Sequence, residues 1–488
     1  MNYPDKETFC SMAGDYNRIP VYHELNIDEP GHLLLLKAME EEGEMVFFES
    51  LGENADDSRF SFLGFRPRYV YTFQNGVLRV NDKVEDEVTG DTVFEYLKDR
   101  IDQYKTPVLN RFGDYTGGLS GYFGYEMVNY CGILRQKVRE STTIPQFMLM
   151  HIDDYICHDN LNGIYYLATA AYPGDDPEKA YNDAAEYLLA LEASVIRRIS
   201  GTMLPYVPSR AETIDPDFCD SREEFMEKVS ETVRMIDSGE ALQTVLSMRA
   251  HVPEGLDPYR FYLRLRKLNP SPYMFYIKSS GMTVTGSSPE VHVRCTGRDA
   301  LLRPIAGTAR RTGDAEEDAH ARRMLLADEK ERAEHLMLVD LARNDLSRIA
   351  QPESVRVTRF MKPENYSHVM HLVSDVTARL DDKKHMIDVF RESFPAGTVS
   401  GAPKVRAIEI IDEMEVYPRG IYSGAVGYIG FNGIMDTCIT IRTAYFTEEG
   451  NYIQAGAGIV QDSIPEKEYE EIKSKLRALS VSLPYAKI

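Results

Sequence analysis

The residues AVGYIGF (425–431) and TCITIRTAYF (437–446) decide the fold class of this chain. Both runs are rich in branched and aromatic residues, a composition typical of buried β-strands. Similar runs occur earlier, at MVFFES (45–50), RFSFLGF (59–65), YVYTF (69–73), TVLSMRAHV (244–252) and YMFYIK (273–278). Helical stretches lie between these runs in no regular order, so we expect an α+β fold rather than a repeating βαβ array.

The spacing of apolar residues predicts helices between the strands. They cover residues 92–104, 177–199, 221–240, 314–346, 404–414 and 465–480. The third of these helices begins with a capping box, in which Ser221 is the N-cap and Glu224 follows three residues later. Residues 201–219 are rich in proline and lack periodicity, so we interpret them as a linker. We therefore predict an N-terminal domain over 1–200 and a second domain over 220–488.

The chain is strongly acidic, with 488 residues, a formal net charge of -22 and a pI near 5.0. This charge disfavours nucleic acid or an anionic membrane as the main partner. The six cysteines form no CxxC pair, which argues against a disulfide framework and a zinc site. The first residues lack the basic start and apolar core of a signal peptide, and the apolar run Leu33 to Leu36 is too short to cross a bilayer. We expect a cytoplasmic protein.

Two of the predicted helices carry glutamates three residues apart. These helices contain the segments KERAEHLMLVDLARNDL (330–346) and PEKEYEEIKSKL (465–476). The glutamates are Glu331, Glu334, Glu468 and Glu471. Residues three or four apart share a helix face, so two opposed faces would gather carboxylates that need a hard cation such as Mg²⁺. The same spacing fits ordinary solvated helix faces. A di-iron site is disfavoured because it needs two Glu-x-x-His motifs, whereas His335 directly follows Glu334 and the last helix has no histidine.

Four glycine-containing turns stand out, namely PIAGTARR (304–311), GTVSGAPK (397–404), GAVGYIG (424–430) and AGAGI (455–459). The second lacks the Gly-Lys-Ser/Thr ending of a phosphate loop, and the third lacks the GxGxxG order, so nucleotide binding is not predicted. Glycine lets backbone N–H groups approach a ligand closely, and such loops with nearby Lys and Arg suit carboxylates. Tight turns in a large domain are the alternative interpretation.

Taken together and in order, these segments resemble the chorismate-binding domain of anthranilate synthase component I and its relatives. The segments that carry the resemblance are PIAGT, EHLMLVDLARNDL, VMHLVS, GTVSGAPK, YSGAVGYIG, DTCITIRTA and QAGAGIVQDSIPEKEYEE. FFES (47–50) and GGLSGYFGYE (117–126) resemble the N-terminal domain of the same family, so the resemblance covers nearly the whole chain. It implies a large two-layer β-sandwich body flanked by helices.

The resemblance implies conversion of chorismate and ammonia to anthranilate and pyruvate, the first committed step of tryptophan biosynthesis. Family members that add water keep a lysine base where this chain has Gln243, and aminodeoxychorismate synthases carry a lysine nucleophile where it has Ala306. A neutral amide cannot take a proton from water at neutral pH, whereas ammonia needs no such activation, and alanine cannot attack carbon. Aminodeoxychorismate synthase component I and a non-catalytic tryptophan-binding relative are the alternatives.

The resemblance also implies roles for individual residues. Mg²⁺ is expected at Glu334 and Glu471, with Glu331 and Glu468 adjacent. Glu290 is expected to protonate the departing hydroxyl, and His371 to serve in the elimination of pyruvate. The residues expected to bind substrate are Gly307, Thr308, Thr398, Tyr422, Arg442, Gly456, Gly458 and Lys475.

Members of this family are inhibited by tryptophan, and the resemblance implies a site for it around FFES, where the family usually has Leu-Leu-Glu-Ser. The residues implied are Glu49, Ser50, Arg59, Pro272, Tyr273, Met274, Val426 and Tyr428. A simple buried strand is the alternative interpretation of FFES. The sequence has no Gly-x-Cys-x-Gly nucleophile turn, so a separate glutamine amidotransferase subunit, component II, is expected to supply ammonia within a heterotetramer.

Overall fold

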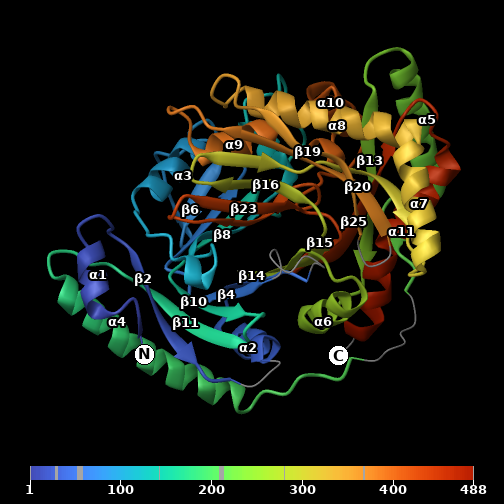
Figure 1. Cartoon of the computed structure of the whole chain (residues 1–488). Helices are drawn as coiled ribbons and strands as arrows, with labels where there is room; N and C mark the ends of the chain where they lie inside the picture. Colours follow the sequence, from blue (N-terminus) through green and yellow to red (C-terminus); the bar gives the residue numbers. More distant parts are fainter. Residues whose placement is uncertain are drawn as a thin grey trace.

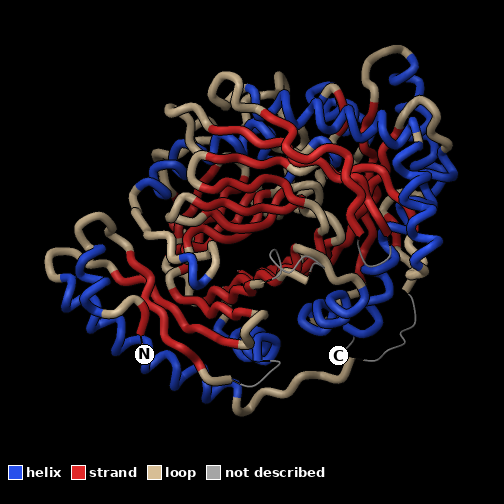
Figure 2. Tube along the Cα trace, viewed as in Figure 1, coloured by secondary structure: helices blue, strands red, loops and turns tan. Residues whose placement is uncertain are grey.

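The structure, a computed structural model, describes residues 2–27, 31–51, 59–141, 143–207, 214–279, 281–365 and 369–486. Its strands form two large antiparallel sheets, with helices around them (Figure 2). The expected α+β class and two-layer body are therefore confirmed. Residues 208–213 of the predicted linker lie outside the described residues.

The first sheet begins with strands from the amino-terminal 200 residues and ends in strands from residue 217 onward. Its order is β1 (Asn2–Tyr3), β2 (Ile19–Leu25), β11 (Ile164–Ala171), β10 (Asp154–Asp159), β4 (Phe60–Phe65), β3 (Met45–Glu49), β14 (Tyr273–Ser279), β15 (Met282–Ser288), β24 (Thr443–Thr447), β25 (Gly450–Ile459), β13 (Gln243–Val252) and β12 (Asp217–Phe218). A short strand, β21 (Gly401–Ala402), also pairs with β13.

The second sheet contains the remaining strands of the described residues. Its order is β18 (Ile305–Arg310), β20 (Val369–Arg379), β17 (Asp299–Leu302), β16 (Val291–Thr296), β23 (Ile434–Ile439), β22 (Ala425–Ile429), β8 (Gly118–Phe123), β9 (Phe147–Ile152), β5 (Tyr69–Gln74), β6 (Val77–Val80) and β7 (Lys83–Val84). β19 (Arg356–Asn365) pairs with β20 from outside this path.

Both sheets combine strands from the two sides of the predicted linker. In the first sheet β3 pairs with β14, and in the second sheet β8 pairs with β22. The division into two domains at 201–219 therefore stays a prediction. Each sheet contains strands from both sides of this segment. A core of buried side chains from both sheets, including Val46, Phe275, Tyr122 and Val426, lies between the two layers.

The helices cover the outer faces of the sheets (Figure 1). They are α1 (Lys6–Met12), α2 (Gly31–Met39), α3 (Val93–Asp102), α4 (Pro177–Ile199), α5 (Arg222–Asp237), α6 (Pro258–Leu268), α7 (Ala315–Ala327), α8 (Glu329–Ser347), α9 (Met386–Ser393), α10 (Lys404–Met414) and α11 (Pro465–Ser482). Helix α4 packs on β2 and β11, α8 on β18 and β20, and α11 on β25. The predicted capping box of α5 is confirmed, because Ser221 and Glu224 bond each other's backbone N–H groups. None of the helices in the described ranges is long and apolar enough to cross a membrane.

Two predicted elements are each divided in the structure. The run 437–446 was expected as one strand, but its first residues end β23 in the second sheet and its last residues lie in β24 of the first. The chain crosses between the layers here, and Arg442 has the left-handed φ of 51°. The predicted helix 314–346 is broken at Asp328, whose extended backbone ends α7 and whose carboxylate caps α8.

Candidate active site

Helices α8 and α11 bring the glutamates of the two predicted acidic faces toward the ends of β13 and β25. Asp328 accepts a hydrogen bond from the Glu331 amide at 3.0 Å and so fixes the first turn of α8. One turn later, Glu334 Oε1 lies 3.4 Å from Nε2 of Gln243, the first residue of β13. Because β13 pairs with β25 and α11 packs on β25, this contact links the two helices through the sheet.

The carboxylates on the two helices influence one another. Burial and the neighbouring charge of Glu331 raise the pKa of Glu334, and the charge of Glu471 on α11 adds to the rise. Burial likewise raises the pKa of Glu468, with a further contribution from Glu471. Glu471 itself forms a 2.7 Å ion pair with Lys475, one helical turn further on. The acidic faces of α8 and α11 are therefore close enough to repel each other.

This arrangement fits a divalent cation held by few protein ligands. In the described parts of the chain, no group of three or more His, Cys, Asp or Glu side chains is gathered around one point. Mg²⁺ commonly uses only one or two carboxylates, with water and substrate completing its shell. A cation between Glu334 and Glu471 would relieve the repulsion that raises the pKa of Glu334.

The glycines of AGAGI in β25 leave room for site side chains. A Cβ atom at Gly456 would lie 2.6 Å from the Tyr422 hydroxyl, and one at Gly458 would lie 2.5 Å from Gln243 Nε2. Lys475 donates a 2.8 Å hydrogen bond to the Gly456 carbonyl. The sequence predicts that Gly456 and Gly458 bind substrate. In the structure, a side chain at either position would collide with Tyr422 or Gln243.

His371 of β20 lies opposite Thr308 of β18. The two strands are in antiparallel register at this pair, next to an irregularity around Gly307, which has the left-handed φ of 83°. The Thr308 hydroxyl lies 3.0 Å from His371 Nδ1, and the Thr308 amide donates to Glu331 Oε2 at 3.0 Å. Burial, together with the charge of Arg442, lowers the pKa of His371 to about 4. The imidazole is therefore neutral at neutral pH and able to accept a proton.

The Glu290 carboxyl is protonated at neutral pH, whereas an ordinary carboxyl group is ionised. Burial raises the pKa of its carboxyl to about 8, against the opposing effects of Thr398, Arg442 and Lys475. At neutral pH the group therefore carries its proton and can act as an acid. Arg442 is thus a common neighbour of Glu290 and His371, because its charge lowers the pKa of both groups.

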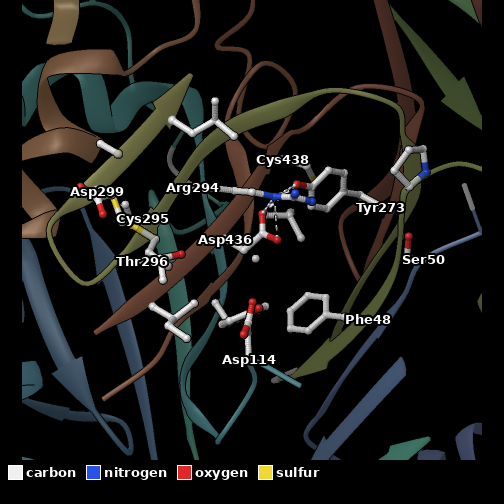
Figure 3. A pocket seen from close by; sticks show the side chains of 18 of the residues that line it. Phe48, Ser50, Asp114, Tyr273, Arg294, Cys295, Thr296, Asp299, Asp436 and Cys438 are labelled. Atoms are coloured by element: carbon white, nitrogen blue, oxygen red, sulfur yellow. Dashed lines mark hydrogen bonds and ion pairs between the residues drawn. The ribbon is translucent and has the colours of Figure 1, made fainter. Parts of the chain in front are cut away.

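The residues implied for tryptophan binding surround a separate cavity of about 700 Å³ (Figure 3). Seven of them line it, namely Glu49, Ser50, Pro272, Tyr273, Met274, Val426 and Tyr428. Arg59 is not among the described residues on the cavity wall, and its guanidinium pairs with Asp159 at 2.8 Å. Of the two aromatic residues in FFES, Phe48 lines the cavity, whereas Phe47 packs in the core against Tyr262.

Glu49 and Ser50 differ in how they meet this cavity. The Glu49 carboxylate receives hydrogen bonds from Tyr262 at 2.8 Å and from two nitrogens of Arg266, each at 2.7 Å. Although burial alone would raise the pKa of Glu49, the hydrogen bonds and charges of Arg266 and His32 lower it to about 2. The buried Ser50 hydroxyl has no hydrogen-bond partner within the described chain. Ser50 is therefore the polar group of FFES that remains available to a ligand.

Sequence reasoning missed the other charged residues of the cavity wall, which are Asp114, Arg294, Asp299, Arg379 and Asp436. Arg294 of β16 donates from Nε to Asp436 Oδ1 at 3.1 Å, and the Tyr273 hydroxyl donates to the same oxygen at 2.7 Å. Figure 3 shows Asp114 and Phe48 on the side of the cavity below this group. Burial and the charge of Asp436 raise the pKa of Asp114. Arg294 and Asp436 are directly paired in the register of β16 and β23. This pairing cannot be recognised from the sequence without knowing the register.

Comparison with known proteins gives a consistent picture. A model of the chorismate binding enzyme family matches residues 49–481. Anthranilate synthase component 1 of Aquifex aeolicus is 39% identical over 98% of this chain and 97% of its own length. The protein of the same name from Acetivibrio thermocellus is 37% identical over 98% of both chains.

Solved structures agree with these sequence matches. The crystal structure of anthranilate synthase component I from Streptococcus pneumoniae superposes with a TM-score of 0.74 at 33% identity, covering 87% of this chain and 92% of that one. The isochorismate synthase MenF of Escherichia coli has a TM-score of 0.70 at 17% identity over 98% of both chains, a likeness of fold alone. From the family match, the relatives and the shared fold together, this chain belongs to the chorismate-binding enzyme family, the family of anthranilate synthase component I.

Proposed function

We propose that this chain converts chorismate and ammonia to anthranilate and pyruvate. The observation that carries the proposal is the shared neighbourhood of Glu290, His371 and Arg442. It combines a protonated acid, a neutral base and a guanidinium, and chorismate is a dianion that needs all three. Arg442 and the Tyr422 hydroxyl hold the enolpyruvyl carboxylate, for which a guanidinium fork is well suited.

In the first half-reaction ammonia adds to the ring and the ring hydroxyl leaves. The carbon–nitrogen bond forms, the carbon–oxygen bond breaks, and the proton of Glu290 departs with the hydroxyl as water. The new ammonium group then returns a proton to the Glu290 carboxylate. The raised pKa of Glu290, about 8, supports this role because a carboxyl with an ordinary pKa would already be ionised.

In the second half-reaction pyruvate is eliminated. His371 takes the ring proton and later releases it to the medium. The bond between the ring carbon and the ether oxygen breaks, the electron pair leaves with the oxygen, and the methylene carbon of the departing side chain gains a proton from the medium. Pyruvate leaves and the ring becomes aromatic. Thr308, 3.0 Å from Nδ1, orients the imidazole for this step, and burial keeps the imidazole unprotonated.

Two residues support ammonia as the direct nucleophile. Gln243 places a neutral amide beside Glu334. Unlike a lysine base, this amide cannot take a proton from water and so cannot activate it. Ala306, next to Gly307 in β18, has no nucleophilic atom and so provides no covalent route to aminodeoxychorismate. Both positions favour anthranilate over the products of the water-adding and aminodeoxychorismate-forming relatives.

The acidic faces of α8 and α11 support a Mg²⁺ requirement. Glu334 and Glu471 would hold the ion, with Glu331 and Glu468 adjacent and Lys475 beside them. When bound, Mg²⁺ would neutralise the ring carboxylate and make the ring more electrophilic. The designation of the relatives as component 1 supports a second component, and we assign to it the hydrolysis of glutamine within a heterotetramer.

The decisive experiment is a turnover assay with purified chain, chorismate, Mg²⁺ and ammonium. Anthranilate fluorescence, pyruvate formation and product mass are followed together, and equal amounts of anthranilate and pyruvate are expected. Accumulation of aminodeoxychorismate, or no turnover at all, would overturn the proposal. Mg²⁺ binding is tested separately by thermal shift on wild type, Glu471→Gln and the control Glu470→Gln, and only Glu471→Gln is expected to lose the shift.

A second function, inhibition by tryptophan, is favoured by the cavity beneath FFES. The cavity joins an aromatic and apolar wall, with Phe48, Tyr273 and Tyr428, to the Ser50 hydroxyl, which has no hydrogen-bond partner among the described residues. An amphipathic amino acid with a large ring matches this lining. Isothermal titration with tryptophan tests the assignment, and no heat at millimolar ligand would refute it.

A further inference from the structure

Arg419 is a fully buried guanidinium next to the candidate active site, with 1% of its surface exposed. A guanidinium has five N–H donors, and at Arg419 five hydrogen bonds use them. Nε and Nη2 bind the two carboxylate oxygens of Glu415 at 2.9 and 2.7 Å. The other three bonds go to the Val399 carbonyl at 2.7 Å, the Val245 carbonyl at 2.6 Å and the Ser423 hydroxyl at 3.2 Å.

Each of these three acceptors lies within two residues of a residue assigned to the site. Val399 follows Thr398, the residue that most opposes the raised pKa of Glu290. Val245 lies two positions after Gln243 on β13, and Ser423 follows Tyr422. One guanidinium therefore ties together three segments that are far apart in the sequence.

The partners of Arg419 are themselves held in place. Glu415 accepts hydrogen bonds from the amide and the hydroxyl of Ser247 at 2.8 and 2.9 Å, which fixes it to β13. The guanidinium also lies 4.9 Å from the ring of Tyr125 and 5.6 Å from the ring of Tyr422. Ser423 has the left-handed φ of 64°, a conformation that its bond to Arg419 helps to retain.

We propose that Arg419 is a positioning residue for the reaction, one that sets Thr398, Gln243 and Tyr422 in register without touching substrate. This inference rests on the active site proposed above. A lysine at this position keeps the charge but not the planar fork, so it can satisfy only some of the acceptors. The segments 243–247, 397–400 and 420–424 then lose their common anchor.

The experiment compares Arg419→Lys with a matched control, Arg18→Lys. Arg18 is also fully buried, pairs with Asp153 at 2.9 Å and donates to the carbonyls of Thr116 and Ile152. None of its partners belongs to the proposed site. Hydrogen exchange is measured by mass spectrometry on both variants and on wild type. Faster exchange in all three segments is expected in Arg419→Lys and not in Arg18→Lys.

Kinetics on the same samples, normalised to folded protein, provide the functional readout. Arg419→Lys is expected to raise KM for chorismate and to lower kcat/KM about 10- to 100-fold, because small displacements of positioning groups have effects of this size. Arg18→Lys is expected to keep wild-type values per folded molecule. If wild type itself does not turn over chorismate, the proposed function fails, and the exchange comparison still decides the role of Arg419.

If Arg419→Lys does not fold, the double variant Arg419→Met/Glu415→Gln replaces it. This pair leaves no unpaired buried charge and keeps an acceptor for Ser247. Unchanged exchange in the three segments, or the same change in Arg18→Lys, overturns the proposal.

Discussion

Gly458 of β25 lies so close to Gln243 of β13 that a Cβ atom on the glycine would be 2.5 Å from the Gln243 amide nitrogen. The missing side chain lets that nitrogen reach Glu334 at 3.4 Å. The second glycine of AGAGI is therefore a requirement of the site and not only of the strand.

Gly458→Ala is expected to displace the Gln243 side chain and lower kcat/KM for chorismate by about 10-fold or more. Overpacking at this contact is also expected to destabilise the fold by roughly 1–3 kcal/mol. Steady-state kinetics and thermal unfolding measure both effects. The control is Gly14→Ala, where a Cβ atom would meet nothing within 4 Å, and wild-type kinetics are expected. Full activity in Gly458→Ala would show that the position of Gln243 does not matter.

The unusual protonation of Glu290 gives a prediction about the alkaline side of the pH profile. Its pKa of about 8 means that the acid is lost as pH rises through that value, so kcat/KM is expected to fall there. Glu290→Gln is expected to lower kcat about 100-fold or more and to remove this limb of the profile. A variant that retains both the rate and the limb would exclude Glu290 as the acid.

The same group affects stability in a direction that can be checked without substrate. The pKa of Glu290 rises from 4.5 to about 8 on folding, so between these values the folded protein holds a proton that the unfolded chain has lost. Its contribution to stability is therefore present at low pH and declines as pH rises through this window. The melting temperature of Glu290→Gln relative to wild type is expected to increase from about pH 6 to about pH 9.

Local sequence patterns predict many of the helices and strands, whereas the roles of the site residues follow from the resemblance to a family and stay predictions. Helix α10 (Lys404–Met414) and strand β3 (Met45–Glu49) lie where apolar spacing and β-propensity predict them. The break at Asp328 is also a local feature, because an aspartate three residues before the Glu331 amide is a typical N-cap. Here the long run of helix-forming residues concealed the cap.

Other features depend on contacts that a single sequence does not contain. Arg442 lies where the chain crosses from β23 to β24, and nothing in the continuous strand-like run 437–446 marks that point. Glu49, predicted to bind tryptophan, lines the cavity, and its carboxylate accepts hydrogen bonds from Arg266 and Tyr262 of α6, more than 200 residues away. The pairing of Arg294 with Asp436 likewise requires the register of β16 and β23. Tertiary packing, rather than propensity, determines each of these.

Ser50→Ala tests the tryptophan cavity through two effects of opposite sign. The Ser50 hydroxyl is buried and has no partner in the part of the chain that the structure describes, so its removal is expected to leave the unliganded protein equally stable or slightly more stable. Loss of one hydrogen bond to bound ligand is expected to raise the Kd for tryptophan about 2- to 10-fold. Thermal unfolding and isothermal titration measure the two effects. An unchanged Kd would remove Ser50 from the binding site.

His371→Met is expected to separate the two half-reactions. With the imidazole gone, ammonia still adds to the ring, but the ring proton stays in place, so aminodeoxyisochorismate accumulates and anthranilate formation stops. Mass spectrometry of the products identifies the intermediate. His320→Met, an exposed substitution on α7, is the control and is expected to make anthranilate at the wild-type rate.

The pH profile of wild type distinguishes this role of His371 from that of an ordinary histidine. Because burial and Arg442 lower the pKa of His371 to about 4, the base remains neutral well below the value of 6.5 at which a solvent-exposed imidazole titrates. The acidic limb of the elimination step is therefore expected near pH 4, measured with aminodeoxyisochorismate supplied as substrate. A limb near the ordinary value would mean that the imidazole is solvated during turnover, and full anthranilate production by His371→Met would refute its role as the base.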